Sequence, residues 1–133
     1  MNINTKTQTL PKFAGGVNVA LWILQILTAA VFLMAGYSKL SGDPKMVEAF
    51  ANIGLGQWFR YVTGSIETVS ALLLLVPRTI PVGALLLICT MLGAIATHLF
   101  VFGDSPIVPI ILLAFNVAIF WKRYDEAGTS REI

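Results

Sequence analysis

The sequence has few charged residues. Asp, Glu, Lys and Arg make up only 12% of its 133 residues, about half the share that a soluble domain carries. Hydrophobic residues make up 56%, and the mean hydropathy is +0.79. So few charges cannot solvate a water-exposed surface, whereas helices that face lipid need none. The composition therefore excludes an ordinary soluble domain and predicts an integral protein of a lipid bilayer.

Cysteine and histidine are almost absent too. A single cysteine, Cys89, excludes an internal disulfide framework and a CxxC redox motif, and we expect it to be a small buried hydrophobic side chain. A single histidine, His98, cannot supply a zinc site or a haem ligand pair, so no metal site is predicted. The net charge of +2 comes without a basic patch, which argues against a nucleic-acid partner.

Four apolar segments have about the length that a helix needs to cross the hydrocarbon core, roughly 20 residues. They are residues 17–37, 58–76, 80–102 and 106–121. Helices rather than strands are predicted, because lipid offers backbone groups no other partner. The first segment is longer than the apolar region of a signal peptide, so we expect it to be retained. The predicted fold is all-α: one membrane domain, a four-transmembrane-helix bundle, with polar tails at residues 1–16 and 124–133.

The loop between the first two segments carries signals of a helix of its own. Asp43 followed by Pro44 is typical of a helix start, and Gly54 is typical of a helix end. Met46 and Phe50 lie on one face at helical spacing. We predict a short amphipathic helix in this first extracytoplasmic loop. It lies in the membrane interface or covers the bundle, or it is an ordinary surface helix.

The distribution of Lys and Arg predicts the orientation. With four spans, both tails and the loop between the second and third spans share one side of the membrane. That side carries Lys6, Lys12, Arg78, Lys122, Arg123 and Arg131, against Lys39, Lys45 and Arg60 on the other. Positive residues are enriched in cytoplasmic loops, so both termini are predicted to lie in the cytoplasm.

Glu67 is the first candidate site residue. It lies about 13 Å below the outer boundary of the second span, where an acid must be paired, neutralised or hydrated. It is either a polar anchor or proton carrier for a ligand, or a structural acid that hydrogen-bonds between helices. Gln25, Thr28 and Thr90 lie at a similar depth and are its candidate hydrogen-bond partners.

Two basic residues approach Glu67 from the outer side. Lys39 ends the first span and would have to bend inward, against the tendency of Lys to reach the interface, or meet Glu67 through water. His98 lies about 7 Å nearer the outer boundary than Glu67. Three roles remain open for His98: a hydrogen-bonded bundle residue, a proton relay or substrate contact, and a metal ligand.

Several short motifs, in this order and spacing, resemble the DoxX-like family. They are Ala35-Gly36-x-x-Lys39-Leu40, Ile53-Gly54-Leu55 before Trp58, Gly64-x-x-Glu67, and Met91-x-x-Ala94-x-x-Thr97-His98. The resemblance covers about residues 17–123. It implies a four-helix membrane bundle, with Lys39 and Glu67 at the characteristic polar positions.

The resemblance also implies classes of function. Family members are linked with thiosulfate:quinone oxidoreduction, with quinone and thiol stress and with membrane oxidoreductase complexes. The leading hypothesis is therefore a quinone- or amphipathic-ligand-binding subunit, with a membrane quinone as its non-covalent cofactor and an oxidoreductase or a second copy as partner. The chain has no cofactor motif and no cysteine pair, which favours a non-catalytic subunit over an enzyme.

Two other classes remain open. One is a chaperone or assembly factor for a membrane protein, because a distant eukaryotic branch of the family includes a receptor-assembly chaperone. The other is a proton-coupled exporter of lipophilic compounds. It is less favoured, because small exporters of that kind carry their acid in the first helix, whereas Glu67 lies in the second.

Overall fold

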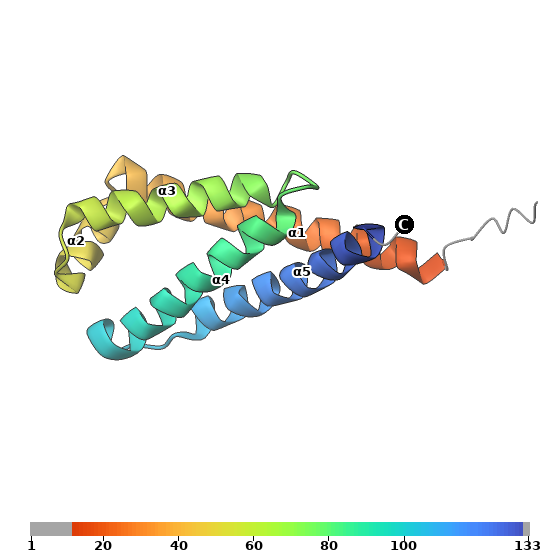
Figure 1. Ribbon diagram of the computed structural model, residues 1–133. Coiled ribbons are helices and arrows are strands. Elements are labelled where there is room, and N and C mark those ends of the chain that lie inside the picture. Colours follow the sequence, from red (N-terminus) through yellow and green to blue (C-terminus); the bar gives the residue numbers. More distant parts are fainter. Residues whose placement is uncertain (1–11, 132–133) are drawn as a thin grey trace, which may run out of the picture.

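The computed structural model describes residues 12–131, with side chains for residues 15–126 (Figure 1). The elements in chain order are α1 (Lys12–Ser41), α2 (Pro44–Ile53), α3 (Gln57–Leu73), α4 (Ile80–Thr97), the π-helical segment η1 (His98–Phe102) and α5 (Ile107–Arg131). No strand occurs in the described residues, which confirms the predicted all-α class. The described part does not include the side chains of Lys6, Lys12 and Arg131, which are counted in the orientation prediction. Most of the 1–16 tail also lies outside it.

Three helical stretches are long and apolar enough to cross a membrane, and the chain is an integral membrane protein. They are Gly15–Ser41, Ile80–Phe102 and Ile107–Glu126. Helix α3 has 17 residues and carries both Arg60 and Glu67, so the four-span count stays a prediction. Helix α5 continues past Trp121 to Arg131, where a tail had been expected from residue 124. No Gly or Pro interrupts residues 122–127, and Arg123 is tied to α1, so the helix does not end there.

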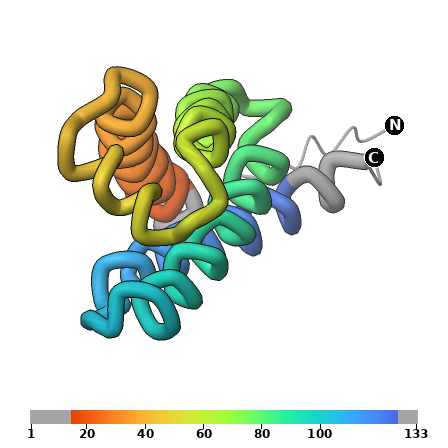
Figure 2. The backbone as a smooth tube through the Cα atoms, turned by 90° about the vertical axis from the view of Figure 1, so that its left-hand side faces the viewer, coloured from red at the N-terminus to blue at the C-terminus, as the bar shows by residue number. Residues whose placement is uncertain are grey.

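The helices pack as two antiparallel pairs. Helix α1 packs mainly against α3, and α4 mainly against α5. Figure 1 shows the two pairs close together near the α3–α4 turn and apart at the end where α2 lies. Figure 2 looks at that second end, where α2 (yellow) contacts α1, α3 and η1. We call the first the narrow end and the second the wide end.

Two glycines allow close helix contacts. A Cβ at Gly83 would lie 2.7 Å from the carbonyl oxygen of Ser70, so α4 approaches the backbone of α3 at the narrow end. A Cβ at Gly64 would lie 2.9 Å from Cβ of Lys39, so α1 and α3 approach closely nearer the wide end. Small residues permit such approaches between membrane helices.

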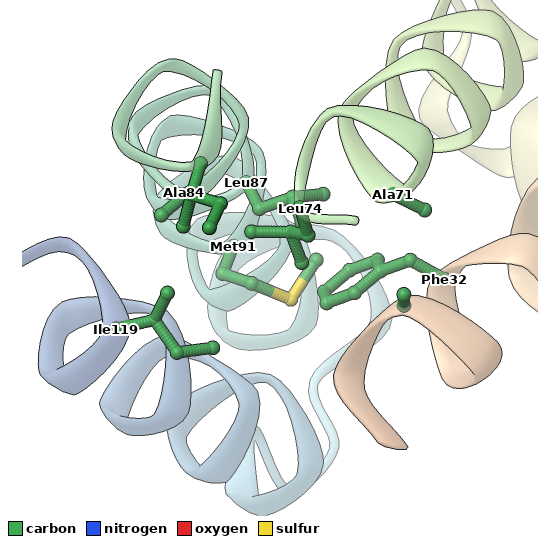
Figure 3. Packing of buried hydrophobic residues seen from close by; sticks show 9 residues of the cluster. Phe32, Ala71, Leu74, Ala84, Leu87, Met91 and Ile119 are labelled. Carbon is green, nitrogen blue, oxygen red and sulfur yellow. The ribbon is translucent and has the colours of Figure 1, made fainter. Parts of the chain in front are cut away.

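The apolar core is small and lies where all four long helices meet (Figure 3). It consists of Ala29, Phe32, Ala71, Leu74, Ile80, Ala84, Leu87, Met91 and Ile119. Most other large apolar side chains point outward, and Leu27, Phe100 and Trp121 are all more than 60% exposed. A surface this apolar fits contact with lipid rather than water.

Candidate functional site

A cavity of about 610 Å³ lies between the two helix pairs, toward the wide end. Aliphatic and aromatic side chains, with two methionines, form most of its lining. The side chains in the lining that carry a charge or a nitrogen or oxygen atom are Lys39, Thr63, Glu67, Thr90, Thr97 and His98. Met46 and Phe50 of α2 also line it, so α2 covers part of the opening. An apolar chamber with a few polar groups is the usual form of a small-molecule site.

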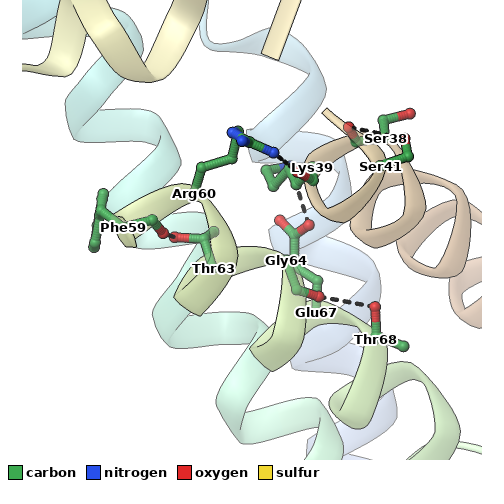
Figure 4. A network of polar contacts seen from close by, with 9 residues as sticks. All are labelled: Ser38, Lys39, Ser41, Phe59, Arg60, Thr63, Gly64, Glu67 and Thr68. Carbon is green, nitrogen blue, oxygen red and sulfur yellow. Dashed lines mark hydrogen bonds and ion pairs between the residues drawn. The ribbon is translucent and has the colours of Figure 1, made fainter. Parts of the chain in front are cut away.

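Lys39 and Glu67 form an ion pair in this lining. Nζ of Lys39 lies 3.0 Å from Oε2 of Glu67, and the two side chains are 14% and 3% exposed (Figure 4). An unpaired carboxylate is costly at such a position, and the ammonium offsets that cost. The pair therefore places two opposite charges beside an apolar chamber.

The direction of side chains on a helix explains how Lys39 reaches Glu67. Each Cα–Cβ bond tilts toward the N-terminus of its own helix. Because α1 and α3 are antiparallel, Lys39 leans from the end of α1 toward the narrow end, whereas Glu67 leans back toward the wide end. The two side chains meet, although their positions counted along the helix axes had suggested a long gap. The sequence left two ways for Lys39 to meet Glu67, an inward bend or a contact through water. The structure shows the inward bend.

Arg60 belongs to the same cluster, although the sequence pattern indicated for it only a place on the outer side of the membrane. The residue is 4% exposed. Nη1 donates to the carbonyl oxygen of Lys39 (Figure 4). Nε donates to Oε1 of Gln57 at 2.8 Å. The guanidinium also lies over the ring of Tyr61, 4.4 Å from its centroid. Arg60 precedes Glu67 by seven residues, two helical turns, and this spacing could have identified it as facing the interior.

Gln57 extends this cluster to α2. Its Nε2 donates to the carbonyl oxygen of Val47 at 3.0 Å, while its Oε1 accepts from Arg60. The contacts therefore run from α2 through Gln57 and Arg60 to the backbone of Lys39. The helix that covers the cavity is thus attached to the residue that forms the ion pair.

His98 lines the cavity but pairs with Asp104 rather than with Glu67. Its Nδ1 lies 2.5 Å from Oδ1 of Asp104, and its ring meets the ring of Phe102 edge-on at 5.4 Å. Gly103, at φ 65°, turns the chain after η1 and brings Asp104 back to His98.

Gln25 and Thr28, predicted partners of Glu67, do not line the cavity. Gln25 instead connects helices at the narrow end: Nε2 donates to the carbonyl oxygen of Leu74 at 3.0 Å, and Oε1 accepts from Nε of Arg123 at 2.7 Å. Arg123 also donates to Oδ1 of Asn18 at 2.8 Å. Gln25 was one of the candidate hydrogen-bond partners of Glu67, and it has other partners because depth along one helix does not give the level at which a neighbouring helix lies.

Thr90 lines the cavity, as do Thr63 and Thr97. Each of the three hydroxyls donates to the carbonyl oxygen four residues earlier in its own helix, at 2.8–2.9 Å. Their oxygens remain able to accept a hydrogen bond, since a hydroxyl offers two lone pairs. Thr90 is therefore a wall residue with acceptor capacity, and Lys39 is the charged donor in the lining.

Cys89 is exposed and lines the cavity, so the prediction of a buried thiol was wrong. Helix α4 turns Ala84, Leu87 and Met91 toward the core, and Cys89 lies on another face of the helix. The sequence could not indicate which face packs inward, because α4 is apolar on every side. Within the described residues, no group of three or more His, Cys, Asp or Glu side chains could hold a metal ion.

Two comparisons with known proteins gave matches. A model of the DoxX-like family matches residues 23–119, more than half of the chain. A protein of Bacillus subtilis (strain 168), whose name is "Putative oxidoreductase CatD", is 29% identical over 75 residues. The aligned part covers 56% of this chain and 56% of that relative, so the chain spans about half of the relative's length. No solved structure matches the chain.

Proposed function

The chain belongs to the DoxX-like family, and from this membership and its cavity we propose that it binds a membrane quinone or a similar amphipathic molecule. In this proposal it is a non-catalytic subunit of a redox or thiol- and quinone-stress system of the bacterial cytoplasmic membrane, with both termini in the cytoplasm. An oxidoreductase partner or a second copy completes the system. The name of the Bacillus relative supports the redox setting.

The Lys39–Glu67 pair in an apolar lining is the observation that carries the proposal. A quinone has an apolar ring and tail with carbonyl oxygens at the head. The ammonium of Lys39 donates to such an oxygen, and the carboxylate of Glu67 accepts from the hydroxyl of the reduced form. The remaining walls take the ring and the start of the tail, where apolar contact gives affinity.

Cys89 provides a reporter for ligand binding because it lines the cavity and is the chain's single cysteine. The purified full chain in lipid nanodiscs is treated with N-ethylmaleimide, with and without decylubiquinone, and labelling is measured by mass spectrometry. The ring of decylubiquinone is fully substituted, so it does not add the thiol itself. We expect it to slow the labelling several-fold. Labelling at the same rate at every decylubiquinone concentration would contradict the proposal.

Substitutions at Glu67 separate a binding role from a structural one. Glu67→Gln retains shape and hydrogen bonding but removes charge and proton transfer. We expect it to insert and fold normally and to lose protection of Cys89 by decylubiquinone, because a carboxylate no longer holds the Lys39 ammonium that contacts the quinone oxygen. If Glu67→Gln keeps full protection while Glu67→Leu yields no folded protein, Glu67 is structural and the proposed site is wrong.

A further inference from the structure

The cluster around Lys39 contains more positive than negative charge. Two cations are buried here: the side chain of Lys39 is 14% exposed, and Arg60 as a residue is 4% exposed. Glu67 is the one buried anion among the described residues of this cluster. Among the described residues, no carboxylate lies within ion-pair distance of Arg60, whose partners are a carbonyl oxygen, an amide oxygen and an aromatic ring. Lys39 and Glu67 cancel one another, so the charge of Arg60 remains.

Groups near the cluster reduce this excess only in part. The last carbonyl groups of α1, one of which Arg60 contacts, carry about half a negative charge together. Asp43 follows α1, but its side chain is engaged with the backbone N–H of Lys45 at the start of α2. Asp104 is more than half exposed, so water and salt screen it. The potential at the Lys39 end of the cavity therefore stays positive.

We infer that the cavity selects amphipathic molecules whose head group is anionic, and that it rejects lipophilic cations of the same size. This inference rests on the proposed function and names the charge class of its ligand. Lys39 is the contact, because it lines the cavity and retains 14% exposure. Arg60 acts behind it as a positioning residue: it holds the backbone of Lys39 and adds its charge without lining the cavity.

Quinones form anionic species that a positive site of this kind would select. A quinone that accepts an electron gains negative charge on its oxygens, and a quinol that loses a proton carries the same charge. A buried positive site stabilises these anionic forms relative to neutral quinone, because charge interactions are stronger where water is excluded. The site would hold the charged forms longer than the neutral ones.

A pair of matched probes tests the inference. One is a 2-hydroxy-3-alkyl-1,4-naphthoquinone, which is ionised in mildly alkaline buffer. The other is its 2-methoxy ether, which is neutral and has the same ring and chain. The alkyl group blocks addition of the thiol in both. The concentration that halves the labelling of Cys89 by N-ethylmaleimide is measured for each, and for an alkyltriphenylphosphonium cation. We expect the anion to protect at about tenfold lower concentration than the ether, which corresponds to a difference near 1.4 kcal/mol, and the cation not to protect.

A substitution identifies the source of the preference. Arg60→Gln removes the charge and the contact with the backbone of Lys39, and we expect it to weaken protection by the anion more than protection by the ether, so that the ratio of the two naphthoquinones falls several-fold. Arg78→Gln is the matched control, because Arg78 is exposed in the α3–α4 turn at the narrow end, and it should leave the ratio unchanged. If Arg60→Gln does not fold, the ratio of the two naphthoquinones in the unsubstituted protein still tests the charge selection.

The outcomes separate the two proposals. If anion and ether protect equally, or the phosphonium cation protects best, the charge selection is wrong while quinone binding stands. If none of the probes protects and decylubiquinone fails as well, the proposed function is wrong and the inference falls with it. An unchanged ratio in Arg60→Gln would show that Arg60 does not contribute.

Discussion

At the scale of single residues, Lys39 and Glu67 depend on each other. A buried ion pair is weak evidence for stability, because both charges lose hydration, but one partner left alone is strongly destabilising. Lys39 is less enclosed than Glu67, at 14% against 3% exposure. The carboxylate is therefore the member that needs its partner more.

This difference predicts the result of a double-mutant cycle. Lys39→Met leaves the carboxylate of Glu67 buried without its cation and should destabilise the protein by about 3 kcal/mol. Adding Glu67→Met removes the unpaired charge and should restore most of that loss. Thermal unfolding in one detergent measures both variants, with Lys45→Met, at an exposed site on α2, as the control. A double variant as unstable as Lys39→Met would show that the two side chains are not energetically coupled.

Cys89 supports a second prediction at this scale. A single thiol cannot form an intramolecular disulfide, so no thiol cycle within the chain can depend on it. We expect Cys89→Ala to retain any phenotype of the gene and the thermal stability of the protein, and to abolish maleimide labelling. Loss of function with normal folding would reveal an intermolecular disulfide or a thiol adduct.

At the scale of helices, the α1–α3 contact determines the geometry of the ion pair. Gly64 lies against Lys39 and Leu40 with no room for a side chain, while Thr68 donates its hydroxyl to the carbonyl oxygen of Gly64 at 2.8 Å. The close approach of the two backbones brings the long side chain of Lys39 within reach of the shorter Glu67. Packing along this contact thus controls the chemistry of the cavity.

A methyl group at Gly64 tests this dependence. Gly64→Ala places Cβ 2.9 Å from Cβ of Lys39, so α1 must shift, at a cost of about 1–3 kcal/mol. We expect a lower melting temperature and weaker protection of Cys89 by decylubiquinone. Gly16→Ala is the control, because its Cβ would meet nothing within 4 Å and alanine favours a helix. Equal melting temperatures for the two variants would contradict the tight contact.

At the scale of the whole molecule, the two helix pairs form a wedge. The apolar core and the Gly83–Ser70 approach close the narrow end, and Arg123 ties α5 to α1 there through Gln25 and Asn18. At the wide end, the described side chains form no hydrogen bond between the α1–α3 pair and the α4–α5 pair, and the cavity lies there with α2 across it. Access to the cavity should therefore depend on the wide end.

Reporter fusions test how this wedge lies in the membrane. The six-to-three distribution of Lys and Arg predicts that a fusion at the C-terminus and one inserted at Arg78 report the cytoplasm, and that one near Asp43 reports the opposite side. An alkaline phosphatase and a green fluorescent protein fusion at each position give complementary signals. A C-terminal fusion active as phosphatase would reverse the predicted orientation and place the wide end toward the cytoplasm.

Features that depend on local chemistry could be predicted from the sequence alone. Runs of apolar residues too long for a soluble helix dictated an all-helical membrane chain, because lipid leaves backbone groups no partner outside the helix. The same reasoning identified Glu67 as a residue whose charge must be compensated, since a carboxylate within an apolar helix carries a cost that can be read from its position alone.

Which residues meet depends on how the helices pack. Lys39 reaches Glu67 because two antiparallel helices lean their side chains toward each other, whereas Gln25, at a similar depth in the sequence, meets Arg123 at the other end. The positions of Arg60 and Cys89 depend on how α3 and α4 are rotated about their axes. Helix rotation, level and tilt come from contacts between segments far apart in the chain, and for α4, which is apolar all round, no local pattern records them.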